Sequence, residues 1–148
     1  MLKNDCLKKK HLGDTLSRIR KNESELTKIL IAEDESELLF LFESYFASLG
    51  IRTETANSGT KTLDLFFDSK DHGIPYDAIV LDTHINNPSG LDVAKRIHSQ
   101  MPDQKLVLVT TTPKEYLSKE CLKIAGIRDT DILPMPFKLS KLVTALTD

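Results

Sequence analysis

The chain has 148 residues, of which 40% are hydrophobic and 28% charged, as expected for one globular domain with a full core. No apolar stretch approaches the roughly 20 residues of a membrane-spanning helix, and the polar N-terminus lacks a signal-peptide core. These features exclude an integral membrane protein, and we expect a cytoplasmic protein without membrane contact.

The net charge of −2 conceals a basic start and an acidic remainder. Residues 1–28 hold eight Lys and Arg against four Asp and Glu, a net of +4, which leaves −6 for the rest. A short basic run such as the three lysines at positions 8–10 is more typical of a solvated tail than of a binding site. We therefore do not expect nucleic-acid binding.

Apolar residues repeat within this basic leader, residues 1–27. Leu12, Leu16 and Ile19 fall at helical spacing, although Gly13 interrupts them. They predict either an extra helix, packed on the body or on a second copy in a homodimer, or a disordered leader. Two turns are too few for a coiled coil, so residues 28–148 are expected to form the single domain.

From residue 28 onward, short apolar runs alternate five times with segments of helical period. The runs predicted as strands cover residues 28–32, 51–56, 76–81, 105–109 and 131–133. Helical stripes follow at residues 38–49, 63–67, 93–101, 117–125 and 139–146. This alternation predicts an α/β fold: a five-stranded parallel sheet with helices on both faces.

Three acidic residues stand where two of the predicted strands stop. Glu33 and Asp34 follow the first strand, Asp82 follows the third, and Thr110 follows the fourth. In folds of this kind the ligand site lies outside the carboxyl ends of the strands. Clustered carboxylates repel one another unless a cation neutralises them, and oxygen ligands suit Mg²⁺. The placement therefore predicts a magnesium site.

Each of these residues also has a simpler interpretation when taken alone. Asp34 or Glu33 could cap a helix that begins near Glu35, and Thr110 could begin a capping cluster of threonines. Their common position with Asp82 at the strand ends favours the metal site over capping.

The order of these residues resembles the receiver domain of bacterial and archaeal response regulators. The matching positions are Glu33-Asp34, Asp82, Gly90 eight residues later, Thr110 and Pro136-Phe137. The resemblance covers residues 28–147 and implies a flavodoxin-like fold with strand order 2-1-3-4-5.

The resemblance also implies a role for each matched residue. Asp82 corresponds to the phosphoacceptor, which takes a phosphoryl group from a sensor histidine kinase or phosphotransfer protein. Glu33, Asp34, Asp82 and the backbone carbonyl of His84 would hold Mg²⁺, and the Thr110 hydroxyl would bind a phosphoryl oxygen. An aspartyl phosphate carries about −1.5 to −2 charge, which a cation and a hydroxyl donor can balance.

The sequence departs from the family pattern near the fifth strand. Met135 stands where family members carry a lysine, and Ile132 stands where they carry an aromatic ring. A thioether cannot make the charged hydrogen bond of an ammonium, which contributes about 1.5 to 3 kcal/mol, so slower phosphorylation is expected. The resemblance places Thr111, Ile132 and Pro136 in the switch region. His84 would restore some positive charge if protonated, although a loop role is the more ordinary interpretation.

The leading hypothesis is a stand-alone phosphoacceptor module of a two-component phosphorelay, not an enzyme. It would signal to a downstream protein through the face formed by the fourth helix, fifth strand and fifth helix. The alternative is a pseudo-receiver that acts as a scaffold or dimerisation module without phosphorylation. A cobalamin-binding domain is disfavoured because Asn87 occupies a required glycine position, and a phosphatase is disfavoured because His84 replaces a required aspartate.

Overall fold

The computed structural model describes residues 26–148, so the predicted leader helix lies outside the described residues. The strands are β1 (Lys28–Ala32), β2 (Arg52–Ala56), β3 (Ala78–Asp82), β4 (Leu106–Thr110) and β5 (Ile132–Pro134). The helices are α2 (Ser36–Ser48), α3 (Gly59–Asp71), α4 (Gly90–Gln100), α5 (Lys119–Ile124) and α6 (Leu139–Thr147), with 3₁₀ turns η1 (Lys114–Tyr116) and η2 (Asp129–Asp131).

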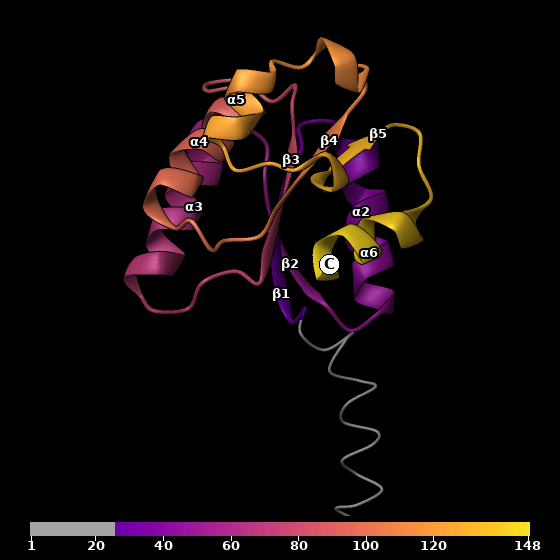
Figure 1. Cartoon of the computed structure of the whole chain (residues 1–148). Coiled ribbons are helices and arrows are strands. Elements are labelled where there is room, and N and C mark those ends of the chain that lie inside the picture. Colours follow the sequence, from indigo (N-terminus) through magenta and orange to yellow (C-terminus); the bar gives the residue numbers. More distant parts are fainter. Residues whose placement is uncertain (1–25) are drawn as a thin grey trace, which may run out of the picture.

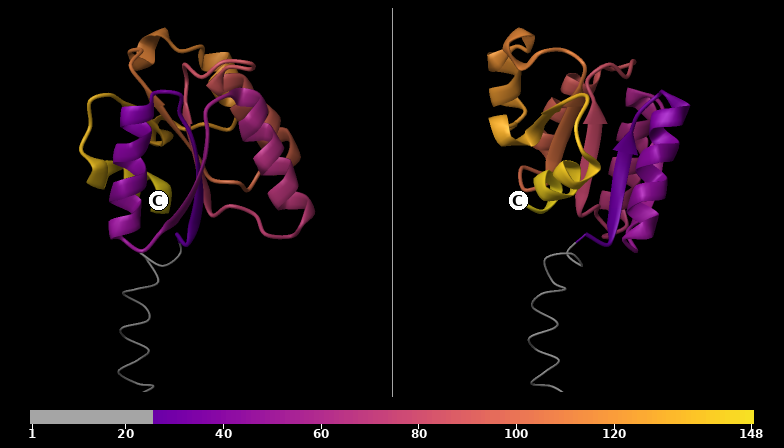
Figure 2. Two further views of the ribbon diagram at one scale, coloured as in Figure 1. Left: turned by 180° about the vertical axis from the view of Figure 1, so that it is seen from behind. Right: turned by 90° about the vertical axis from the view of Figure 1, so that its right-hand side faces the viewer.

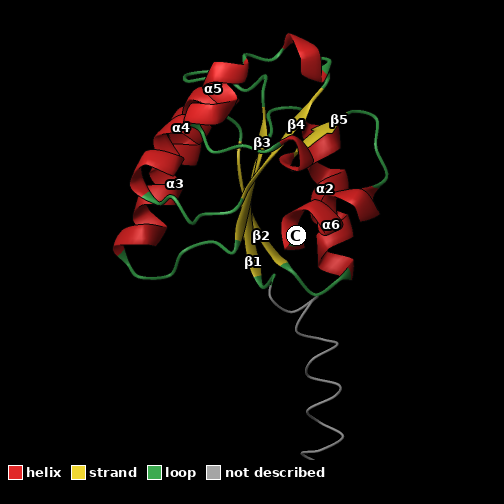
Figure 3. Ribbon diagram, in the orientation of Figure 1, coloured by secondary structure: helices red, strands yellow, loops and turns green. Residues whose placement is uncertain are grey.

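The five strands form one parallel sheet in the order β2-β1-β3-β4-β5, which confirms the predicted topology. Every residue of β3 and β4 is buried because helices cover both faces of the sheet, while β2 at the edge is largely half-exposed. In Figure 1 and Figure 3, α3, α4 and α5 lie on one side of the sheet and α2 and α6 on the other. Figure 2 shows β5 toward one edge and β1 with β2 toward the other.

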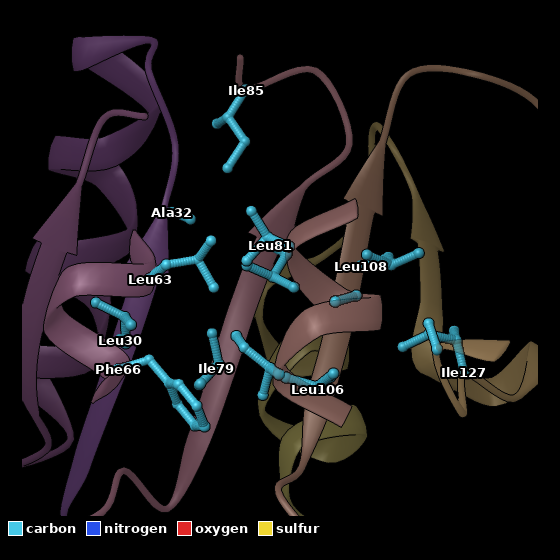
Figure 4. Close-up of a cluster of buried hydrophobic side chains, with 14 of the residues drawn as sticks. Leu30, Ala32, Leu63, Phe66, Ile79, Leu81, Ile85, Leu106, Leu108 and Ile127 are labelled. Atoms are coloured by element: carbon cyan, nitrogen blue, oxygen red, sulfur yellow. The ribbon is translucent and has the colours of Figure 1, made fainter. Parts of the chain in front are cut away.

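The hydrophobic core has two halves because successive strand residues point to opposite faces. On the face covered by α3 to α5, Leu30 and Ile79 pack with Leu63 and Phe66 of α3, as Figure 4 shows. On the opposite face, which α2 and α6 cover, the largest fully buried side chains of the cluster are Ile29, Ile31, Phe42, Phe46 and Leu142.

The first strand has its predicted bounds, whereas the other four begin one or two residues later than predicted. The fifth strand begins one residue late because Asp131 lies in η2, where it accepts hydrogen bonds from Arg128 and from Lys105 Nζ at 2.7 Å. The fourth predicted helix is shortened to α5, whose N-cap Ser118 accepts a hydrogen bond from the Cys121 N–H. In the described part of the chain, no helix combines the length and apolar character needed to cross a membrane.

Candidate functional site

Glu33 and Asp82 lie side by side at the carboxyl edge of the sheet. β1 and β3 are neighbours, and Ala32 pairs with Leu81, so the next residue of each strand reaches the same level. The N–H of Glu33 donates to the carbonyl of Ala56, which extends the pairing with β2. Both acids are almost fully buried, with 1% of Glu33 and 5% of Asp82 exposed. The sheet register therefore brings two carboxyl groups together away from water.

Burial makes ionisation of Glu33 unfavourable. Desolvation first, and then a hydrogen bond with Asp82, raise the pKa of Glu33 to about 8. Its Oε2 accepts a hydrogen bond from the Glu35 N–H at 3.1 Å, while Oε1 is buried and has no hydrogen-bond partner among the described residues. The two buried carboxylates would repel each other if both were ionised. Either a proton on Glu33 or a bound cation can neutralise this charge.

Asp34, the third acid, is exposed beside this pair. Within residues 26–148, no three acidic, His or Cys side chains already converge as a metal site, so the predicted trio is only partly assembled. The donor chemistry nevertheless suits Mg²⁺, because the unpartnered Oε1 of Glu33 is a hard oxygen ligand next to the Asp82 carboxylate. Glu33, Asp34 and Asp82 are the side chains that would hold the ion.

Neither Glu33 nor Asp34 is the N-cap residue of α2, although Glu33 Oε2 accepts a hydrogen bond from the N–H of that residue. The N-cap of α2 is Glu35, and its side chain makes no capping hydrogen bond. Thr110 does not cap the fourth predicted helix either, because that role belongs to Ser118 of α5.

His84 lies at the mouth of the site. Its backbone N–H donates to Asp82 Oδ1 at 2.7 Å, and its half-exposed ring brings Nδ1 within 3.6 Å of the same oxygen. The ring lies between two threonine hydroxyls: Nδ1 is 3.2 Å from Thr83 Oγ1, and Nε2 is 3.3 Å from Thr112 Oγ1. His84 thus joins the loops that follow β3 and β4. The role of its backbone carbonyl as a metal ligand stays a prediction.

Thr110 is fully buried at the end of β4. Its Oγ1 accepts hydrogen bonds from Thr83 Oγ1 at 2.8 Å and from the Thr112 N–H at 3.0 Å. The sequence interpretation did not identify Thr83 and Thr112 as partners. The available signal was their position one or two residues beyond the ends of neighbouring strands, where hydroxyl groups can meet.

Met135, which the resemblance places at a lysine position of the family, lies next to Thr110. Its N–H donates to the Thr110 carbonyl at 2.7 Å, and its half-buried side chain packs against the α2 and α6 face. Of the predicted switch residues, Thr111 and Pro136 line the same apolar groove as Met135. Ile132 instead packs into the core on the other face of the sheet. The switch positions are therefore divided between two faces.

Gly90 sets the approach of α4 to the end of β3. A Cβ atom at this position would lie 2.1 Å from the carbonyl oxygen of Asp82, so any side chain would force the two segments apart. Ser89 caps α4 by accepting a hydrogen bond from the Asp92 N–H, which fixes where the helix begins.

Known proteins share this architecture. The response regulator SaeR of Staphylococcus aureus is 25% identical over 123 residues, which cover 83% of this chain and 50% of SaeR, so the chain spans about half the length of the curated relatives it matches. A response regulator receiver domain protein of Clostridium thermocellum superposes with a TM-score of 0.71 at 24% identity, covering 82% of this chain and 91% of that one. TrrA of Thermotoga maritima, solved in complex with Mg²⁺-BeF, superposes with a TM-score of 0.67 at 27% identity, covering 81% and 98%.

The family assignment rests on most of the chain. Residues 29–147 match the model of the response regulator receiver domain, and this range includes every strand residue except the first residue of β1. The chain therefore belongs to the response regulator receiver domain family of two-component systems.

Proposed function

We propose that this receiver domain accepts a phosphoryl group on Asp82 with Mg²⁺ bound beside it. The observation that carries the proposal is the buried pair of Glu33 and Asp82 at the edge where strand order reverses, with Glu33 Oε1 lacking a hydrogen-bond partner among the described residues. The donor would be a phosphohistidine of a sensor kinase or phosphotransfer protein.

The residues present suit such a transfer. An oxygen of the Asp82 carboxylate bonds to phosphorus as the bond from phosphorus to the donor nitrogen breaks, and the donor imidazole keeps that electron pair. Mg²⁺, when bound, screens the repulsion between the carboxylate and the phosphoryl oxygens. Deprotonated Glu33 and Asp34 would hold the ion, while the Thr110 hydroxyl, whose oxygen accepts a hydrogen bond from Thr83, would donate its own proton to a phosphoryl oxygen.

The comparison with TrrA supports the choice of ion. TrrA is 27% identical to this chain and was solved with Mg²⁺ and a beryllofluoride group. The same two ligands are therefore the natural probes for Asp82 and its neighbours here.

The output of the module is proposed to be protein binding rather than enzymatic turnover, in the cytoplasm. Its binding face would comprise α5, β5 and α6, with a downstream protein as the partner. This face carries a cavity of about 520 Å³ between η1, α5 and β5, and its lining combines three lysines, two acids and three apolar residues: Lys114, Lys119, Lys123, Glu115, Asp129, Leu122, Ile127 and Ile132. The cavity offers a partner apolar contact and charges of both signs, with Lys114 paired to Asp129 at 3.2 Å.

A second candidate function is a pseudo-receiver that binds partners without being phosphorylated. Met135 is the observation that favours it, because a thioether lines an apolar groove where the family pattern has a cation. The two candidates differ in whether Asp82 accepts a phosphoryl group.

The deciding experiment treats the full chain with acetyl phosphate and Mg²⁺ and measures the intact mass. One acid-labile phosphoryl adduct is expected in the native chain and is lost in Asp82→Asn. Asp103→Asn is the matched control, because Asp103 is exposed in the turn before β4. A native chain without an adduct, or an adduct that persists in Asp82→Asn, would refute the proposed phosphoacceptor.

A further inference from the structure

An apolar groove of about 410 Å³ opens on the α2 and α6 face, next to the phosphoacceptor edge. Its lining is apolar except for Thr111, and its main contributors are Leu38, Leu41, Phe42, Met135, Phe137 and Leu139. On the same helix, Leu41 is 49% exposed and Phe40 is 70% exposed. Exposed apolar side chains grouped beside a groove mark an interaction surface.

The chain enters the fold on the face that carries this groove. Leu26 is 4% exposed and belongs to the same buried cluster as Phe42 and Phe46 of α2. The 25 residues before it are thus tethered beside α2. A stretch such as residues 20–25 spans about 20 Å when extended, which exceeds the roughly 17 Å length of a five-residue strand. Ile19 can therefore reach the level of the groove.

The charges of the two partners are opposite. Residues 1–22 contain seven Lys and Arg against two acidic residues, Asp5 and Asp14. None of the residues that line the groove is charged, and Lys138 flanks one side of it, but the α2 side, residues 33–51, carries acidic residues and no Lys or Arg. The acids at or near its surface are Asp34, Glu35, Glu37 and Glu43.

We infer that the leader docks into this groove of its own chain through Leu12, Leu16 and Ile19. These residues repeat at the i, i+4, i+7 spacing with which a helix presents one apolar face to a groove. The covalent link makes the contact intramolecular, so a low intrinsic affinity between leader and groove suffices. The docking does not depend on phosphorylation and stands apart from the proposed function.

The three methionines allow a direct test in the full chain. Met135 lies in the groove, whereas Met101 packs against the opposite core cluster and serves as an internal control. Cys121→Ser leaves Cys6 as the single thiol for a nitroxide label. With methyl-labelled methionine, the oxidised nitroxide is expected to reduce the Met135 methyl signal relative to the reduced nitroxide, and to leave Met101 at full intensity.

Matched leader variants identify the docking residues. Leu16→Glu is expected to restore the Met135 signal, while Ser17→Glu, which adds the same charge one residue later and off the apolar stripe, retains the loss. An unchanged Met135 signal in the labelled chain, or an equal loss in Leu16→Glu and Ser17→Glu, would overturn the inference. The intramolecular assignment would also fail if labelled chains reduced the Met135 signal of separate, unlabelled chains in a mixture. None of these readouts uses phosphorylation, so they distinguish this inference from the phosphoacceptor proposal.

Discussion

The backbone N–H of Met135 donates to the carbonyl oxygen of Thr110 at 2.7 Å, which fixes the residue after β5 against the strand end that carries the buried hydroxyl. A side chain at position 135 therefore starts next to the candidate site. We expect Met135→Lys to increase the rate of phosphorylation by acetyl phosphate about 10- to 100-fold, because a charged hydrogen bond contributes about 1.5 to 3 kcal/mol. The rate is measured by intact mass at fixed Mg²⁺.

Met135→Leu is the control for this gain, because it preserves volume and apolar character in the groove. It should retain the slow native rate. If the leucine variant accelerated phosphorylation as much as the lysine variant, the effect would come from altered packing rather than from the new charge. A lysine variant no faster than the native chain would show that position 135 does not reach the phosphoryl group.

The raised pKa of Glu33 predicts that stability falls as pH rises. Its pKa is about 8 in the folded chain, against an ordinary value of 4.5, so the folded state binds the extra proton between these values. Unfolding releases that proton, and the free energy of unfolding therefore decreases from about pH 5 to pH 8 in the absence of metal. Urea unfolding across this range should show the slope in the native chain and a weaker slope in Glu33→Gln.

Magnesium binding should have the opposite pH dependence. The ion requires ionised Glu33, so below pH 8 it must displace a proton, and its affinity should rise by at most about tenfold per pH unit. Calorimetry in buffers of different ionisation enthalpy would count the released protons. An affinity for Mg²⁺ that is constant from pH 6 to pH 8 would contradict a role for Glu33 as a ligand.

The sequence predicted a parallel sheet and the strand ends to within two residues, because continuous apolar runs identify buried parallel strands, whereas the strand order was implied by the family resemblance. It could place Glu33, Asp82 and Thr110 at one edge, since parallel strands share their carboxyl edge. It could not reveal that Thr83 holds Thr110, because this contact depends on how two loops fold back toward each other. The position of Ile132 on the opposite face from Met135 likewise depends on where β5 begins, and the ion pairs of Asp131 set that point.

Gly90 should be intolerant of even the smallest side chain. A Cβ would lie 2.1 Å from the carbonyl oxygen of Asp82, so Gly90→Ala must displace either α4 or the end of β3. We expect a loss of more than about 2 kcal/mol in the free energy of unfolding, which is large for a single substitution. Gly73→Ala is the control: its positive φ of 71° costs about 1 to 2 kcal/mol, but no atom lies within 4 Å of the added Cβ.

The two glycine variants also separate overall stability from the site. Gly90→Ala should weaken Mg²⁺ binding in the fraction that remains folded, because the displaced carbonyl belongs to the candidate phosphoacceptor itself. Gly73→Ala should bind Mg²⁺ as the native chain does, since the turn after α3 precedes β3 and lies away from the carboxyl ends of the strands. Equal Mg²⁺ affinities in the two variants would argue against the close packing of α4 on Asp82.

The hydrogen bond from Thr83 to Thr110 should couple the loops after β3 and β4. Thr83→Val removes the donor at nearly constant shape, and we expect it to cost about 0.5 to 1.5 kcal/mol, whereas Thr83→Ser keeps the hydroxyl and should cost less. A double-mutant cycle with Thr110→Val isolates the pairwise term, because Thr110 also accepts from the Thr112 N–H and its single replacement loses both bonds. Urea unfolding of the four chains gives the coupling energy. A coupling indistinguishable from zero would mean that His84, which approaches both loops, joins them without the threonine pair.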